Sequence, residues 1–165
     1  MKLSLRLATA LENSLPGYPL WDICCDHGLL GIHALMSKNF PEVHFVDQVP
    51  EIMSSLSAKI ERKRTALMSL ASYHLLPAEN IQHSLEGSVC VLGVGAQKIE
   101  IFLNAWEAAG LLQAQRLILG PHKDEGWFLK NVIPSLQKYQ LQKQIDLRER
   151  GRLRTIFILD KKSFI

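Results

Sequence analysis

The first fifty residues alternate between two hydrophobic periods. Leucines recur at every fourth position from Leu3 to Leu15 with polar residues between them, which predicts an amphipathic helix. The apolar run 20–25 predicts a short buried strand, residues 28–37 carry apolar side chains at helical spacing, and residues 43–47 predict a second strand that ends in an acid. Strand, helix and strand in this order predict a βαβ unit.

The same alternation continues to the end of the chain. Pro50 can begin a helix that runs into a basic group, whereas residues 65–74 fit neither period clearly. The later expected elements are strands at 73–76, 89–93 and 116–120, helices at 98–109 and 125–139, and closing strands at 141–147 and 152–159. This order predicts an α/β fold, with a doubly wound, mostly parallel sheet and a C-terminal antiparallel hairpin. Flavodoxin-like and dinucleotide-binding domains share the alternation, so the site must decide the function.

Composition agrees with a folded enzyme. With 165 residues, 47% of them hydrophobic and 21% charged, the chain has core material for a single domain over residues 1–165. No run approaches the roughly 20 apolar residues that cross a bilayer, so we expect no membrane partner. Cys24, Cys25 and Cys90 lack the paired spacing of a zinc site and favour a reducing, cytoplasmic location. A net charge of +3 does not by itself indicate a nucleic-acid partner.

Ligands of open parallel sheets lie beyond the carboxyl ends of the strands, which makes the loop after the first strand the first candidate site. Loops that bind S-adenosylmethionine (SAM) commonly place an acid before three alternating glycines, so that the ligand can approach the backbone closely. Here Asp22 supplies the acid, Cys24 and Asp26 occupy two of the glycine positions, and only Gly28 is a glycine. On this pattern alone, an ordinary loop is an equally good interpretation.

A second acid stands at the end of the second strand. Asp47 follows Asp22 by 25 residues, at a position where a carboxylate can accept hydrogen bonds from both ribose hydroxyls of a nucleoside. A solvated carboxylate at a strand end is the alternative interpretation, and it has equal weight.

Four stretches in order carry a resemblance to a known family. They are Leu3-Ser4-Leu5-Arg6-Leu7, Asp22-Ile23-Cys24-Cys25-Asp26-His27-Gly28, Gly93-Val94-Gly95-Ala96, and Leu119-Gly120-Pro121-His122 followed by Trp127-Phe128-Leu129. They resemble the motifs L-S-x-R-L, D-I-G-S-D-H-A, G-M-G-G, and L-Q-P-N with a W-L pair, of the bacterial tRNA adenine-N1 methyltransferase family. The sequence departs from these motifs at Cys24, Ala96 and His122, where the family has two glycines and an asparagine.

The resemblance implies a Rossmann-like class I SAM-dependent methyltransferase that modifies N1 of an adenine in the D-arm of tRNA. SAM is the implied cofactor, RNA is the implied partner, and no DNA is expected. The family also carries a C-terminal helical extension that helps to hold tRNA. The sequence ends at Ile165 without it, so we expect a partner protein to take its place. Two alternatives stay open: a catalytically silent SAM-binding or RNA-binding module, and a methyltransferase for a small molecule.

Asp26 is the candidate catalytic residue. A carboxylate that accepts a hydrogen bond from the exocyclic amine of adenine would orient the ring and stabilise the developing positive charge. A carboxylate that caps the following helix is the alternative. The candidate cofactor-binding residues are Asp22, Cys24, His27, Gly28, Asp47, Ala78, Glu79, Gly93 and Gly95. For His27 and the two later glycines, a backbone hydrogen bond and a sharp turn remain the alternatives.

Candidate substrate contacts lie later in the chain. His122 follows the fifth strand and could face the acceptor, although a surface-loop histidine is the alternative. Arg150, Arg152 and Arg154 could neutralise RNA phosphates. An ordinary solvated hairpin is the alternative there, and a second basic group could contact RNA instead: Lys59, Arg62, Lys63 and Arg64.

Two other chemistries fit poorly. Lys98 stands where the third glycine of a dinucleotide-binding motif belongs after Gly93 and Gly95. The consecutive Cys25, Asp26 and His27 do not suit nucleophilic catalysis, because triads assemble from residues that converge in space. The sequence therefore favours methyl transfer over hydride transfer or hydrolysis.

Overall fold

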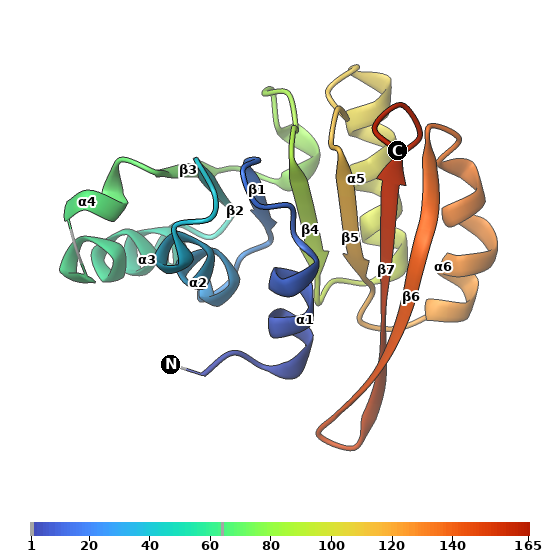
Figure 1. The fold of residues 1–165 in the computed structure, drawn as a ribbon, viewed down its shortest axis with the longest axis horizontal. Helices are drawn as coiled ribbons and strands as arrows, with labels where there is room; N and C mark the ends of the chain where they lie inside the picture. Colours follow the sequence, from blue (N-terminus) through green and yellow to red (C-terminus); the bar gives the residue numbers. More distant parts are fainter. Residues whose placement is uncertain (1, 64) are drawn as a thin grey trace.

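The computed structural model describes residues 2–63 and 65–165, so Arg64 of the basic group lies outside the described residues. Its centre is a seven-stranded sheet with the order β3-β2-β1-β4-β5-β7-β6 (Figure 1). The strands are β1 (Leu20–Ile23), β2 (Val43–Asp47), β3 (Ala71–Leu75), β4 (Ser88–Leu92), β5 (Arg116–Gly120), β6 (Tyr139–Glu149) and β7 (Arg152–Lys161). The first five strands are parallel, and β7 runs antiparallel to both β5 and β6. The mostly parallel sheet with a terminal hairpin is confirmed.

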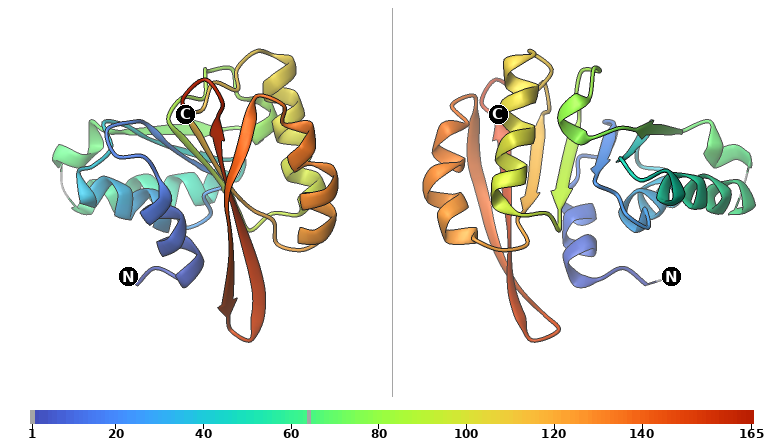
Figure 2. Two further views of the ribbon diagram at one scale, coloured as in Figure 1. Left: turned by 45° about the vertical axis from the view of Figure 1, so that its right-hand side comes forward. Right: turned by 180° about the vertical axis from the view of Figure 1, so that it is seen from behind.

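Helices cover both faces of the sheet (Figure 2). One face carries α1 (Leu5–Asn13), α2 (Leu29–Ser37) and α3 (Pro50–Lys63). The other carries α5 (Ala96–Ala108), α6 (Glu125–Asn131) and the 3-10 turn η1 (Ala78–Asn80). Two further short helical segments are α4 (Thr65–Met68) and η2 (Ile133–Ser135).

The strand period of two divides the core between these layers. Phe45 packs on the side of α2 and α3, whereas Trp21 and Ile23 pack on the side of α5. Trp106 of α5 is fully buried, and its indole N–H donates to the carbonyl of Ala78 at 2.8 Å. This bond anchors η1, which follows the carboxyl end of β3.

Two expected elements differ from the structure. The helix expected over 125–139 is wrong in its second half: α6 ends at Asn131, because Pro134 cannot donate a helical backbone hydrogen bond and its ring clashes with the preceding turn. The unclear segment 65–74 contains α4 and the start of β3, which is a partly exposed edge strand. Within the described ranges, no helix has the length and apolar character needed to cross a membrane.

Candidate functional site

The loop after β1 has the backbone conformation of three alternating glycines. Cys24, Asp26 and Gly28 have φ angles of 55°, 50° and 67°, all in the left-handed region. This region costs a residue with a Cβ atom roughly 1–2 kcal/mol, whereas glycine enters it freely. The fold therefore imposes the glycine-type conformation on Cys24 and Asp26.

Asp47, at the end of β2, holds this loop in place. Its Oδ2 accepts the backbone N–H of Asp26 at 3.1 Å, and its Oδ1 accepts the backbone N–H of Val49 at 3.1 Å. Each carboxylate oxygen has a second lone pair, so both can still accept a hydroxyl from a ligand. Asp47 is thus more than a solvated strand end, because it connects β2 to the loop after β1.

Asp22 lies beneath the loop and is only 6% exposed. Its Oδ2 accepts the backbone N–H of Gly31 in α2 at 3.0 Å. Burial, with a smaller contribution from the carboxylates of Asp47 and Asp26, raises the pKa of Asp22 to about 7, although the hydrogen bond from Gly31 opposes this rise. A cation bound beside Asp22 would stabilise its ionised form.

Two cavities meet at this loop. The larger, of about 400 Å³, is lined by Arg6, Leu7, Asp22, Cys24, Cys25, Asp26, His27, Leu29, Leu30, Ile52, Leu92, Gly93 and Val94. The smaller, of about 150 Å³, is lined by Cys24, Val46, Asp47, Gln48, Leu76, Pro77, Ala78, Glu79, Val94, Lys98 and Phe102. Cys24 and Val94 belong to both linings, so an extended ligand that fills both cavities would pass between these two side chains.

Asp26 and His27 stand at the open side of the larger cavity. Their side chains are 70% and 71% exposed, and His27 Nε2 lies 3.9 Å from Asp26 Oδ1. The helix-capping alternative for Asp26 is wrong, because the N-cap of α2 is Gly28 and no side chain caps it. Asp26 therefore faces solvent at the mouth of the cavity.

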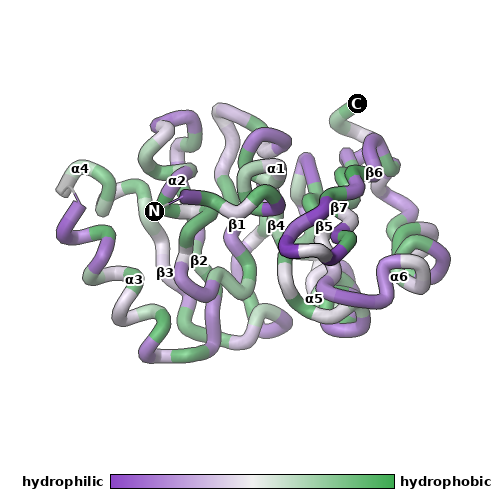
Figure 3. Tube along the Cα trace, turned by 90° about the horizontal axis from the view of Figure 1, so that it is seen from below, coloured by the Kyte–Doolittle hydropathy of each residue, from purple (hydrophilic) through white to green (hydrophobic). Residues whose placement is uncertain are grey.

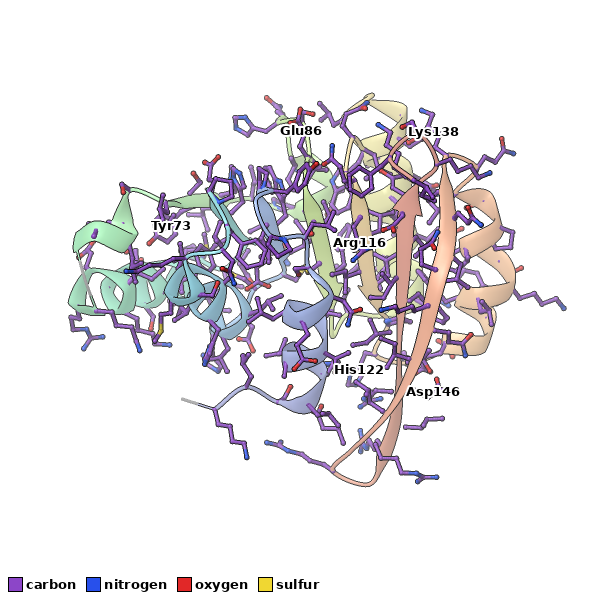
Figure 4. The ribbon with its side chains drawn as sticks, viewed as in Figure 1. Tyr73, Glu86, Arg116, His122, Lys138 and Asp146 are labelled. Atoms are coloured by element: carbon purple, nitrogen blue, oxygen red, sulfur yellow. The ribbon has the colours of Figure 1, made fainter. Side chains whose placement is uncertain are left out.

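The loop after β4 closes the opposite side. Gly93 has a φ of 79°, and a Cβ atom there would lie 3.4 Å from the guanidinium of Arg6. Gly95 has ordinary extended backbone and is the N-cap of α5. The N–H of His122 donates to the carbonyl of Val94 at 2.7 Å, and Arg154 Nη1 donates to the carbonyl of His122 at 2.7 Å. The exposed side chain of His122 lies near α1 in Figure 4.

The β6–β7 hairpin projects beyond the carboxyl edge of the parallel strands, at the end of the sheet where α1 lies (Figure 1). The larger cavity is at the same edge, because the loops after β1 and β4 line it. Arg150 and Gly151 form its turn, and Arg152 is exposed at the start of β7. Figure 3 views the molecule from this edge and shows a largely hydrophilic turn. Arg150 and Arg152 are thus free at the tip, whereas Arg154 supports the loop of His122.

The comparisons with known proteins agree with this geometry. A family model described as a methyltransferase domain matches residues 3–157. The chain belongs to this methyltransferase family.

Solved structures similar to this methyltransferase share its fold. B. subtilis m1A22 tRNA methyltransferase TrmK is 22% identical with a TM-score of 0.78, over 97% of this chain and 67% of that one. M. capricolum TrmK in complex with S-adenosylhomocysteine is 16% identical with a TM-score of 0.77, over 98% and 70%. Magnesium protoporphyrin IX methyltransferase ChlM from Synechocystis PCC 6803 with bound SAM is 14% identical with a TM-score of 0.70, over 94% and 76%. No curated protein sequence matches the chain. The expected Rossmann-like class I methyltransferase fold is confirmed.

Arg6 is a site residue that the sequence interpretation missed. It lies on α1, lines the larger cavity, and its buried Nε has no hydrogen-bond partner among the described residues. Burial lowers the pKa of Arg6, and the charge of Glu149 opposes this effect. The signal was present in the stretch Leu3 to Leu7, whose only charged residue is this arginine.

The cysteines of the methyltransferase are poor nucleophiles. Burial raises the pKa of Cys24 to about 11, and it also raises the pKa of Cys25. Both thiols stay protonated near neutral pH, and a thiol is a far weaker nucleophile than a thiolate. This agrees with the expectation that the site does not perform nucleophilic catalysis.

Proposed function

We propose that this methyltransferase uses SAM to methylate an RNA base, with N1 of adenine in tRNA as the leading candidate. The observation that carries the proposal is the left-handed backbone at Cys24, Asp26 and Gly28, placed where two cavities meet between the acids Asp22 and Asp47. SAM consists of a nucleoside and an amino-acid moiety joined through a sulfur atom, so it needs two adjoining compartments of this kind. The similarity to TrmK favours a tRNA substrate, and the expected partner protein remains part of the proposal.

The described residues fit SAM in one orientation. Asp47 lines the smaller cavity and has lone pairs for the two ribose hydroxyls, while Ala78 and Glu79 would flank the adenine. Asp22 would attract the positive charge of the methionine end from the larger cavity, and Arg6 would pair with its carboxylate. His27 and Gly93 line the same compartment, whereas Gly28 and Gly95 line neither cavity and would act only through the backbone of the two loops. SAM supplies an already activated methyl group, so the protein mainly has to align the acceptor.

The acceptor base would enter from the solvent side, where Asp26 stands. Its carboxylate would accept a hydrogen bond from the exocyclic amine of adenine, which keeps N1 directed toward the methyl group. His122 is exposed at the same edge and would contact the base or its neighbour. Arg150 and Arg152 would bind backbone phosphates, and Arg154 would hold the His122 loop.

The test is single-turnover transfer of labelled methyl to tRNA by Asp26→Asn, beside a SAM titration of the same variant. Asparagine tolerates left-handed backbone, so the fold should persist. We expect transfer to fall by roughly 10²-fold or more, the usual scale for a positioned acid–base group, with SAM affinity little changed. Asp124→Asn is the matched control, because Asp124 is also exposed and left-handed but does not line the cavity at Asp26.

The outcomes separate the alternatives. Equal transfer by wild type and Asp26→Asn would remove Asp26 from catalysis. SAM binding without transfer to any RNA would favour the silent module, or a small-molecule acceptor if transfer to one is found. No binding of SAM or its demethylated product would contradict the proposal as a whole.

A further inference from the structure

A groove lies at the amino edge of the sheet, away from the candidate methyl-transfer site. Between β3 and β4 the described chain has η1 and a loop in place of a long crossover helix. The groove has a volume of about 460 Å³ and is lined by Pro19, Trp21, Glu42, His44, Ser72, His74, His83, Ser84 and Glu86. Figure 4 labels Glu86 near this edge and His122 near the opposite one.

Two histidines in the groove are held in fixed positions. His44 of β2 stacks on Trp21 of β1 with ring centroids 3.7 Å apart and planes within 6°. His44 Nε2 lies 3.3 Å from Glu42 Oε2, and the other oxygen of Glu42 accepts the hydroxyl of Ser72 at 2.6 Å. His44 Nδ1 lies 3.0 Å from His74 Nε2 of β3. Stacking on Trp21, the contact with Glu42 and the hydrogen bond to His74 therefore fix His44 beside His74.

This arrangement places two ring nitrogens 3.0 Å apart, where they share one proton in a hydrogen bond. When the N–H of His44 is on Nε2 beside Glu42, Nδ1 accepts the Nε2–H of His74, and an ion bound by both rings would replace that shared proton while His74 keeps its proton on Nδ1. Metal-bound histidines commonly use their other ring N–H in this way, with a carboxylate as the acceptor. Two nitrogens at about 2.0–2.1 Å from one zinc ion are about 2.8–3.4 Å apart for bond angles from 90° to tetrahedral. The 3.0 Å separation of His44 and His74 falls in that range.

A third imidazole is within reach of this pair. His83 is exposed on the loop before β4, and its ring meets that of His74 edge-on with centroids 5.3 Å apart. As the side chains stand, no three His, Cys, Asp or Glu within residues 2–63 and 65–165 form a ready metal site. The third ligand must therefore come from a side chain that turns, and His83 is free to do so because it is exposed on a loop.

We propose that this groove binds a divalent transition-metal ion of the zinc type. His44 Nδ1 and His74 Nε2 are the fixed ligands, His83 is the third, and water from the open groove completes the coordination. Imidazole suits zinc, copper and nickel ions, whereas calcium and magnesium prefer oxygen ligands. The bound ion joins β2 and β3 to the loop before β4. In this way it would stabilise a part of the fold where a crossover helix is replaced by η1 and a loop. This metal site is separate from the proposed transfer of methyl groups.

The experiment is isothermal titration of the metal-free full chain with Zn²⁺, followed by thermal unfolding with and without the ion. We expect one ion per chain and a higher melting temperature in its presence. His74→Gln should abolish this binding, and His83→Ala should weaken it at least tenfold. His33→Gln is the control, because His33 lies on α2 and bonds only the carbonyl of Leu29 there. A Co²⁺ titration adds a spectroscopic signature, since Co²⁺ in a four-coordinate site of three imidazoles and one water absorbs visible light far more strongly than the hydrated ion.

His83 is exposed on a loop, so its replacement should leave the fold intact, and circular dichroism checks this for both variants. Zinc binding that survives either substitution unchanged would overturn the site, as would the absence of one-to-one binding in the wild type. Neither result would bear on SAM binding, which is measured separately.

Discussion

Replacing Cys24 by glycine should stabilise the loop after β1 relative to replacing it by alanine. At a φ of 55°, a residue with a Cβ atom bears a left-handed penalty of roughly 1–2 kcal/mol. Glycine removes that penalty, but its greater freedom in the unfolded chain costs about 0.5–1 kcal/mol. The glycine variant should therefore exceed the alanine variant by up to about 1.5 kcal/mol, or a few degrees in melting temperature for a chain of this size.

Alanine is the right reference because both substitutions remove the Cys24 thiol and its partly buried contacts with the core on the α5 side. The neighbouring Cys25 offers a matched control, since it is not among the residues with positive φ. There the order should reverse, with Cys25→Gly less stable than Cys25→Ala by the ordinary cost of glycine. Chemical denaturation of the four variants measures both differences.

The same pair tests the passage between the cavities. Cys24 belongs to the linings of both, so removing its side chain widens the route along which SAM would lie. Calorimetric SAM affinity should rise in Cys24→Gly. If Cys24→Ala proves as stable as Cys24→Gly, the argument from backbone conformation is wrong. If SAM affinity then falls in both variants, the thiol itself contacts the ligand.

Three further predictions concern the same edge of the protein. SAM affinity should rise roughly tenfold between pH 6 and pH 8. A pKa of about 7 leaves Asp22 mostly neutral at the lower pH, and only its ionised carboxylate attracts a cation. In Asp22→Asn, calorimetric titrations over the same pH range should show no rise in SAM affinity due to residue 22. Asp47→Asn should weaken SAM binding about tenfold or more in calorimetry. The amide nitrogen of asparagine cannot accept the N–H of Asp26 or Val49, and the negative charge beside the ribose hydroxyls is lost. Unchanged affinity would remove Asp47 from the site. Replacing Arg150 or Arg152 by Gln should each reduce the slope of log tRNA affinity against log salt concentration by roughly one unit. If the slope falls instead when Lys59, Arg62 and Lys63 are replaced, the RNA binds at α3.

Local periodicity predicted most of the sheet. Strands with buried residues on both faces, such as β4, are continuous apolar runs, and their parallel pairing follows from the helices between them. The edge strand β3 was unclear because its residues are only partly buried, which removes the apolar signal. The helix after residue 125 was extended too far, because apolar spacing continues past Pro134 although the backbone cannot.

The candidate site could be predicted where its residues lie at the carboxyl end of a strand. Asp22, Cys24 and Asp47 could be placed together from the rule that carboxyl ends of parallel strands share an edge, and the structure brings them together. Whether Cys24 and Asp26 keep a glycine-type backbone could not be predicted, because residue type alone argues against it. The histidines of the groove were also out of reach, since the pairing of β2 with β3 makes His44 and His74 neighbours and the loop before β4 then brings His83 to His74.

The methyl-transfer edge is held together by contacts between distant parts of the chain. The N–H of Arg6 on α1 donates to Glu149 at the end of β6 at 3.4 Å, and Arg154 of β7 holds the carbonyl of His122. Both contacts come from residues close to the turn of the hairpin, and both lead to residues beside Gly93 at the larger cavity. A phosphate bound at the hairpin tip would therefore contact the same part of the hairpin that holds α1 through Glu149 and the loop after β5 through Arg154. Under the proposed function, this connection would hold RNA at the hairpin and a methyl donor in the cavities in a constant relative position, which the alignment of acceptor and methyl group requires.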